Sequence, residues 1–111
     1  MSEQRNTYWC MVKVDFTEPS LEAEFNEWYN TVHLPELLEF PGFYKAYRLQ
    51  VTDEGTPRGE PGQTYIDVYE IEHPAVFDQE HFKAKPAWDG KWEPYLKNWS
   101  RTYYRVLWPE S

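Results

Sequence analysis

The chain has little of what several classes of protein require. It contains one cysteine, Cys10, which excludes an internal disulfide and a cysteine-based metal cluster. Lys and Arg number 11 against 19 Asp and Glu, and a net charge of −8 argues against binding to nucleic acid or anionic membranes. No apolar run reaches the ~20 residues of a membrane-spanning helix, and the N-terminus has no apolar signal core. We therefore expect a soluble cytoplasmic protein.

Aromatic residues, by contrast, are abundant. Six Trp, nine Tyr and six Phe make up 19% of the chain, nearly half of its hydrophobic content of 41%. Aromatic side chains bury large areas and form flat walls of cavities. Their number predicts a ligand cavity, a large interface, or simply an aromatic-rich core. A length of 111 residues predicts one domain, residues 1–111.

Apolar and polar residues alternate in several segments, which predicts β-strands. In the first strand, Tyr8 and Cys10 should share one face, and Trp9 should lie on the other. In the second strand, Phe43 should share a face with Lys45. The predicted strands cover residues 8–16, 43–51, 64–72 and 101–108.

Helical spacing marks the segments between the strands. An apolar stripe runs from Leu21 through Phe25 and Trp28 to Val32. This helix should end near residue 33 or 34, because Pro35 disfavours helical geometry in the residue before it. Further helices are expected over residues 74–85 and 87–98.

The resulting order is β-α-β-β-α-β, with apolar residues on both faces of most strands. Helices on one side of the sheet would explain one apolar face only, and a large exposed apolar patch is uncommon in a monomer. We therefore predict a ferredoxin-like α+β fold with an antiparallel sheet. Two copies would pack sheet against sheet as a homodimeric α/β barrel.

Three segments carry a resemblance to a known family: EWYNTVHLPELLEFPGFYKAYRL, YIDVYEI and WEPYLKNWSRTYYRV. Together they resemble the dimeric α/β-barrel superfamily, and specifically its EthD-like branch, over residues 8–107. That superfamily includes muconolactone isomerases, polyketide cyclases, cofactor-free monooxygenases and more distant haem enzymes. The resemblance therefore implies the fold more strongly than the reaction.

His33 is the leading candidate for catalysis, because imidazole titrates near neutrality and serves as general acid and base. The resemblance places it where methylmuconolactone methylisomerases have a proton-transferring histidine, before a Pro-Gly strand start matched by Pro41-Gly42. The alternative is a histidine favoured by the dipole at a helix C-terminus. Glu36 would orient His33, cap the next turn, or simply face solvent. Pro35 breaks the His-x-x-Glu pair, so no metal is expected.

Polar residues on the strands complete the candidate site. A tyrosine hydroxyl can stabilise an enolate, and an arginine can hold a carboxylate. A carboxylate in mid-strand, Asp67, needs a partner, which Arg48 or Lys13 would supply. The sequence leaves open which strand face lines the cavity. The predicted catalytic residues are His33, Glu36, Tyr44 and Asp67, and the predicted substrate-binding residues are Trp9, Met11, Trp28, Tyr47, Arg48, Tyr65, Tyr69, His81 and Trp88.

These observations predict an enzyme without a cofactor that transfers protons on a small apolar substrate in the barrel cavity. Isomerisation, cyclisation or elimination of an aromatic or cyclic compound would fit. One alternative is an oxidative enzyme, either cofactor-free or haem-dependent, with His81 as an axial ligand. The other is a dimer that binds a small molecule without catalysis.

Overall fold

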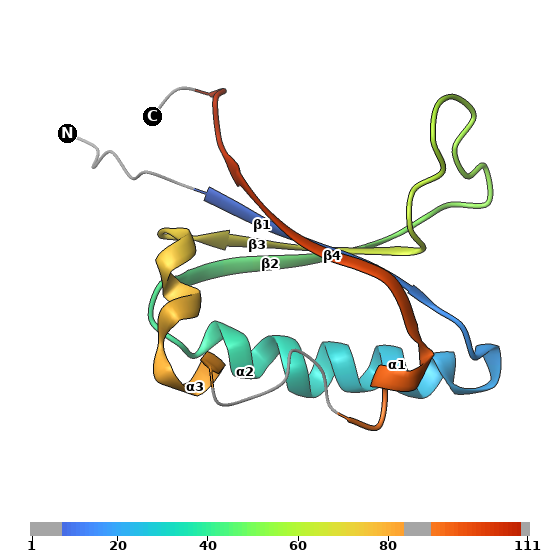
Figure 1. Cartoon of the computed structure of the whole chain (residues 1–111), viewed down its shortest axis with the longest axis horizontal. Coiled ribbons are helices and arrows are strands. Elements are labelled where there is room, and N and C mark those ends of the chain that lie inside the picture. Colours follow the sequence, from blue (N-terminus) through green and yellow to red (C-terminus); the bar gives the residue numbers. More distant parts are fainter. Residues whose placement is uncertain (1–7, 84–89, 110–111) are drawn as a thin grey trace.

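A four-stranded antiparallel sheet with helices on one of its faces forms the protein (Figure 1). The computed structural model describes residues 8–83 and 90–109, without the side chains of residues 81 and 83. The strand order β2-β3-β1-β4 confirms the predicted ferredoxin-like α+β fold. The strands are β1 (Tyr8–Phe16), β2 (Phe43–Gln50), β3 (Tyr65–Ile71) and β4 (Leu96–Arg105).

Strand β1 lies in the middle of the sheet and follows the predicted alternation. It pairs with β3 on one side and with β4 on the other. Cys10 and Val14 are fully buried beneath the helices, whereas Trp9 is 38% exposed on the opposite face. The period of two in the sequence therefore separates the residues of the two faces of β1, as predicted.

Strand β2 departs from the predicted alternation at its first residues. Phe43 pairs with Ile71, but the next pair is Lys45 with Glu70, so the register shifts across Tyr44. This β-bulge turns Phe43 toward the helices, where it is buried, while Lys45 lies on the other face. The prediction that these two residues share a face is wrong, because the alternation does not reveal an extra residue.

The first helix does not end near residue 33. A short 3₁₀ turn (η1, Pro19–Leu21) leads into α1 (Glu22–Trp28), a π turn (η2, Tyr29–His33) and α2 (Leu34–Leu38). Within the π turn, Leu34 donates its backbone N–H to the carbonyl of Tyr29, five residues earlier. The wider turn accommodates Pro35, which has no N–H to donate, and the helix continues past it.

The π turn also changes which residues face the sheet. Tyr29 is fully buried, whereas Val32, predicted to belong to the apolar stripe, is 48% exposed. An extra residue in one turn rotates everything that follows around the helix axis. The stripe therefore continues through Tyr29 and the half-buried His33 instead of through Val32.

The second half of the chain contains less helix than predicted. A 3₁₀ turn (η3, Pro74–Asp78) and one short helix (α3, Glu80–Lys83) precede residues 84–89, which lie outside the described part. The 3₁₀ turn η4 (Glu93–Tyr95) leads directly into β4. The expectation of a helix up to residue 98 is therefore wrong in its described part, because pairing with β1 makes a strand of residues 96–105.

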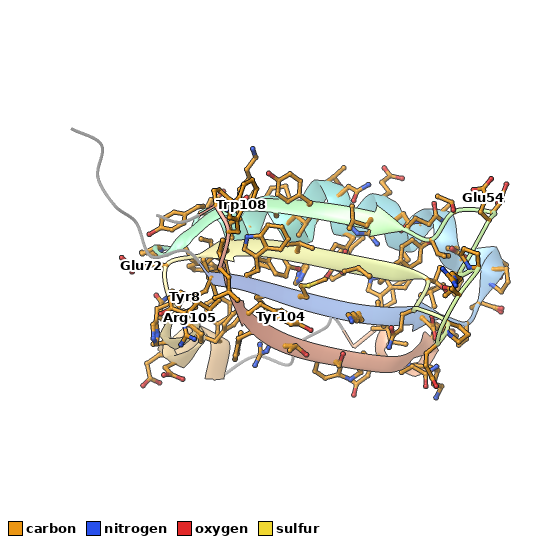
Figure 2. The ribbon with its side chains drawn as sticks, turned by 90° about the horizontal axis from the view of Figure 1, so that it is seen from above. Tyr8, Glu54, Glu72, Tyr104, Arg105 and Trp108 are labelled. Atoms are coloured by element: carbon orange, nitrogen blue, oxygen red, sulfur yellow. The ribbon has the colours of Figure 1, made fainter. Side chains whose placement is uncertain are left out.

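The sheet has two contrasting faces. We call the face under the helices the covered face and the opposite one the open face. Figure 2 looks onto the open face, where Tyr104 is labelled. Side chains there are large and apolar yet more than a third exposed: Trp9 at 38%, Tyr47 at 39%, Tyr104 at 44% and Leu49 at 51%.

Candidate functional site

A buried ion pair lies at the centre of the covered face. Arg48 on β2 and Asp67 on β3 are cross-strand neighbours, and Nε of Arg48 donates to Oδ1 of Asp67 over 2.9 Å. Asp67 has no exposed surface. Burial raises the pKa of its carboxyl group, although the Arg48 charge and the Tyr29 hydroxyl oppose this. Of the two partners predicted for Asp67, Arg48 and Lys13, it is Arg48 that forms the ion pair.

Arg48 also reaches the first helix. Its Nη1 donates to Oδ1 of Asn26 in α1 and to Oδ1 of Asn30 in the π turn, each over 3.0 Å. Its Nη2 has no hydrogen-bond partner among the described residues. The two asparagines were not predicted from the sequence. Their spacing of four residues, which places them on one side of a helix, was the available signal.

Aromatic rings surround the Arg48 guanidinium group. Its Cζ atom lies 4.2 Å from the centre of the Tyr29 ring, 5.0 Å from that of Tyr65 and 5.8 Å from that of Phe25. Such distances allow cation–π attraction, which strengthens when water is excluded. The cation is therefore held by charge, hydrogen bonds and ring contacts together.

Two tyrosine hydroxyl groups meet beside the ion pair. The hydroxyl oxygens of Tyr29 and Tyr69 lie 3.1 Å apart and are buried. Burial raises the pKa of both phenols, and the nearby Asp67 charge raises each further. Both tyrosines are therefore neutral at physiological pH.

Tyr65 links the far end of the same face to the helix. Its hydroxyl group donates to the carboxylate of Glu22 and accepts a hydrogen bond from Nδ2 of Asn26 over 3.1 Å. Burial, followed by the hydrogen bond to Glu22, raises the pKa of Tyr65. Asn26 thus contacts both Arg48 and Tyr65, which joins these residues into one polar network.

His33 lies at the end of the π turn, between two aromatic rings. It stacks on Trp28 with ring centres 4.9 Å apart and meets Tyr29 edge-on at 4.8 Å. Burial lowers the pKa of His33 from 6.5 to about 4; the exposed Glu36 partly opposes this, and Arg48 adds to it. The imidazole is therefore neutral at pH 7 and has a nitrogen lone pair that can accept a proton.

The structure divides the predicted site residues between the two sides of the sheet. Trp9, Met11 and Tyr47 lie on the open face, so the sheet separates them from His33. A single site lined by all the predicted residues is therefore ruled out within one chain. Tyr44 lies at the bulge of β2 and is 37% exposed. His81 and Trp88 belong to the predicted set but lie outside the described side chains. The covered face brings together Trp28, His33, Arg48, Tyr65, Asp67 and Tyr69.

The described residues contain neither a cluster of metal ligands nor a membrane-spanning helix. Among the side chains that the structure describes, no three of His, Cys, Asp or Glu lie close enough together to hold a metal ion. No helix in these ranges is long and apolar enough to cross a membrane.

Comparison with known proteins identifies the fold. No family model matches the chain, and no curated protein matches it in sequence. Among solved structures, a candidate antibiotic biosynthesis monooxygenase from Nitrosomonas europaea is similar, with a TM-score of 0.63, 16% identity and full coverage of both chains. A candidate monooxygenase from Shewanella loihica has a TM-score of 0.62 and 20% identity, over 95% of this chain and 98% of its own.

Two other similar structures bear on the predicted resemblance. An EthD family protein from Bacillus halodurans has a TM-score of 0.59 and 15% identity, over 91% of this chain and 99% of its own. A haem degrader from Mycobacterium tuberculosis, with two haems in its active site, has a TM-score of 0.61 and 15% identity, over 90% of this chain and 95% of its own. The chain therefore has a ferredoxin-like fold, which it shares with an EthD family protein and with proteins named as monooxygenases.

Proposed function

We propose that the protein is an enzyme that transfers a proton on a small apolar substrate, with His33 as the general acid and base and without a cofactor. The observation that carries this proposal is the neutral, half-buried imidazole of His33 at a π turn, packed between Trp28 and Tyr29. π turns interrupt α-helices frequently at functional sites. A neutral imidazole is the form that can remove a proton.

The low pKa of His33 favours a particular kind of proton transfer. The neutral imidazole would accept a proton from a carbon next to a carbonyl group, and the electron pair of the broken C–H bond would form an enolate. The resulting imidazolium is a strong acid, because burial disfavours its charge. It returns the proton readily to another atom of the same substrate. Isomerisation or cyclisation therefore fits better than permanent removal of the proton.

The neighbours of His33 support the class of substrate. Trp28 is half-buried and stacks on His33, so it offers a flat apolar surface beside the base. An aromatic or cyclic substrate would stack there. Glu36 is exposed near His33 and raises its pKa, so it would stabilise the imidazolium when this forms. Asp67, Tyr29 and Tyr69 are buried and would hold the site in shape.

The experiment that tests this function incubates the protein with a panel of enolisable lactones and cyclic ketones in D₂O, and NMR follows both the isomerised or cyclised products and the incorporation of deuterium. General acid–base catalysis contributes roughly 10²–10⁴-fold to a rate, so His33→Ala should lower the rate of product formation by about that factor. His73→Ala is the matched control, since His73 is exposed at the end of β3 and should leave the rate unchanged. Full activity in a folded His33→Ala protein would reject the assignment.

An oxidative reaction is the second candidate, because similar structures carry the names of monooxygenases and of a haem degrader. The described residues do not fit a haem between the helices and the sheet. Phe25, Tyr29 and Tyr69 are buried there around the Arg48–Asp67 pair. Oxidation without haem would consume dioxygen when substrate is added, which an oxygen electrode detects. A Soret band after incubation with haem would show that the protein does bind haem.

We also infer that the open face packs against a second copy of the chain. Its exposed Trp, Tyr and Leu side chains form the kind of apolar surface that oligomers bury. A dimeric ferredoxin-like protein from an uncultured marine organism has a similar structure, with a TM-score of 0.61 and 14% identity over 93% of this chain and 97% of its own. Without catalysis, such a dimer would remain a small-molecule-binding protein, the third candidate.

A further inference from the structure

We propose that Arg48, through Asn26 and Asn30, is a positioning residue that holds the π turn against the sheet and so orients the His33 imidazole. This inference rests on the proposed role of His33. A role in orienting His33 would explain why the covered face holds the ion pair between Arg48 and Asp67. A buried ion pair is weak evidence for stability, since apolar residues often replace it at no cost.

The hydrogen bonds of Arg48 join three elements. Nε binds Asp67 on β3, while the two bonds of Nη1 reach Asn26 in α1 and Asn30 in the π turn. Asn26 precedes the π turn and Asn30 lies within it, so one guanidinium nitrogen holds the helix on both sides of Tyr29. The attachment therefore lies where the helix changes from α to π geometry.

Tyr29 connects this attachment to His33. The Cζ atom of Arg48 lies 4.2 Å from the centre of the Tyr29 ring, and the His33 ring centre lies 4.8 Å from the same ring. His33 also stacks on Trp28. A shift of the π turn would move Tyr29 and His33 together, and a displacement of about 1 Å at a reacting group can cost ~10²-fold in rate.

The geometry requires an arginine. Its planar group directs N–H bonds in fixed directions from three nitrogens and packs flat on aromatic rings. A lysine at position 48 would carry the same charge, but its single nitrogen cannot reproduce the separate bonds from Nε and Nη1. Arg48→Lys therefore separates the effect of geometry from that of charge.

The test follows the His33 ring by NMR in the full-length protein, with His33→Gln used to assign its signals. The variants are Asn30→Ala, which removes one acceptor at an exposed position, and Arg48→Lys. Thr31→Ala is the matched control. It removes a hydrogen bond from Oγ1 to the carbonyl of Glu27 in the same turn without touching Arg48. The measurements are the pH titration of His33 and the NOE contacts between its ring and Trp28.

We expect the pKa of His33 to start near 4 in the parent protein. In Asn30→Ala and Arg48→Lys it should rise by about one unit or more toward its ordinary value, because a loosened ring is better solvated. The contacts to Trp28 should weaken, whereas Thr31→Ala should change neither. Asn30→Asp keeps an acceptor for Nη1 and should restore the contacts to Trp28. Among the described residues, the charges of Arg48 and Glu36 act on His33, and Glu36 is the same in all variants.

An unchanged titration and unchanged ring contacts in folded Asn30→Ala would overturn the proposal, even if the variant were less stable. Should Arg48→Lys fail to fold, Asn30→Ala decides alone. None of these readouts needs a substrate, so the outcome is independent of the His33→Ala activity test. Once a substrate is known, Asn30→Ala should lower kcat by up to about 10²-fold and leave KM unchanged.

Discussion

The two faces of the sheet are built from the same strands but hold their polar groups in opposite ways. On the covered face, Asp67 is buried and bound by Arg48, and the hydroxyl groups of Tyr29 and Tyr69 lie together. On the open face, Glu70 lies on the same strand as Asp67 and accepts a hydrogen bond from the hydroxyl group of Tyr47 over 3.3 Å near solvent. The same type of side chain therefore has different roles on the two faces. A carboxylate on the covered face needs a partner within the protein, whereas one on the open face can bond to water.

The largest contrast between the faces should come from removing one carboxylate from each. Asp67→Leu leaves the Arg48 charge buried without its partner and should lower the free energy of unfolding by about 3–5 kcal/mol. Glu70→Leu should change it by no more than about 0.5 kcal/mol. Urea unfolding at one protein concentration measures both. The double variant Arg48→Met/Asp67→Leu should recover most of the loss, and equal effects of the two single variants would contradict the contrast.

A charged substitution on the open face should instead weaken the association of two copies of the chain. Leu49→Asp places a charge where we infer the second copy packs and should weaken dimerisation by about 10²-fold or more, because the charge would be buried unpaired. Val32→Asp is the control, since Val32 is 48% exposed on the helix and Leu49 is 51% exposed on the sheet. Sedimentation over a range of concentrations measures the equilibrium. If the parent protein stays monomeric at micromolar concentration, the proposal that two copies form a barrel is wrong.

The covered face should also make stability depend on pH. The pKa of His33 is about 4 in the folded protein and 6.5 when unperturbed, so between these values the unfolded chain binds a proton that the folded one does not. Stability is therefore complete above pH 6.5 and is lost as the pH falls toward 4, by up to about 3 kcal/mol. His33→Gln should remove this component. Parallel stability curves for the two proteins would show that His33 is not buried in its neutral form.

The smallest expected difference in stability comes from removing one tyrosine hydroxyl group from each face. Tyr69→Phe removes a buried hydroxyl group from its contact with Tyr29 and should cost about 1–3 kcal/mol. Tyr47→Phe removes an exposed hydroxyl group from its contact with Glu70 and should cost less than about 0.5 kcal/mol. Thermal and urea unfolding of both variants measure this. A larger cost for Tyr47→Phe would indicate that the dimer buries this hydroxyl group.

Much of the covered face could be predicted from local pattern. The alternation in residues 8–16 correctly predicted which residues of β1 share a face, and a carboxylate in mid-strand required a partner for Asp67. The contribution of Asn26 and Asn30 could not be predicted, because their spacing of four residues is also common among solvated residues on one side of a helix. Their role arises only when β2 brings Arg48 beneath the helix.

Sequence alone specifies the order of the strands along the chain and which residues of β1 share a face, because a strand without a bulge keeps its period of two. It also determined that Asp67 needs a cation. The positions of the π turn, of the bulge in β2 and of the first residue of β4 follow from the folded structure and not from the pattern of the sequence. Each of these depends on one residue more or less in a turn or ladder, and contacts between distant segments set that number. His33 therefore owes its identity to the sequence and its neutral, packed state to the folded sheet beneath it.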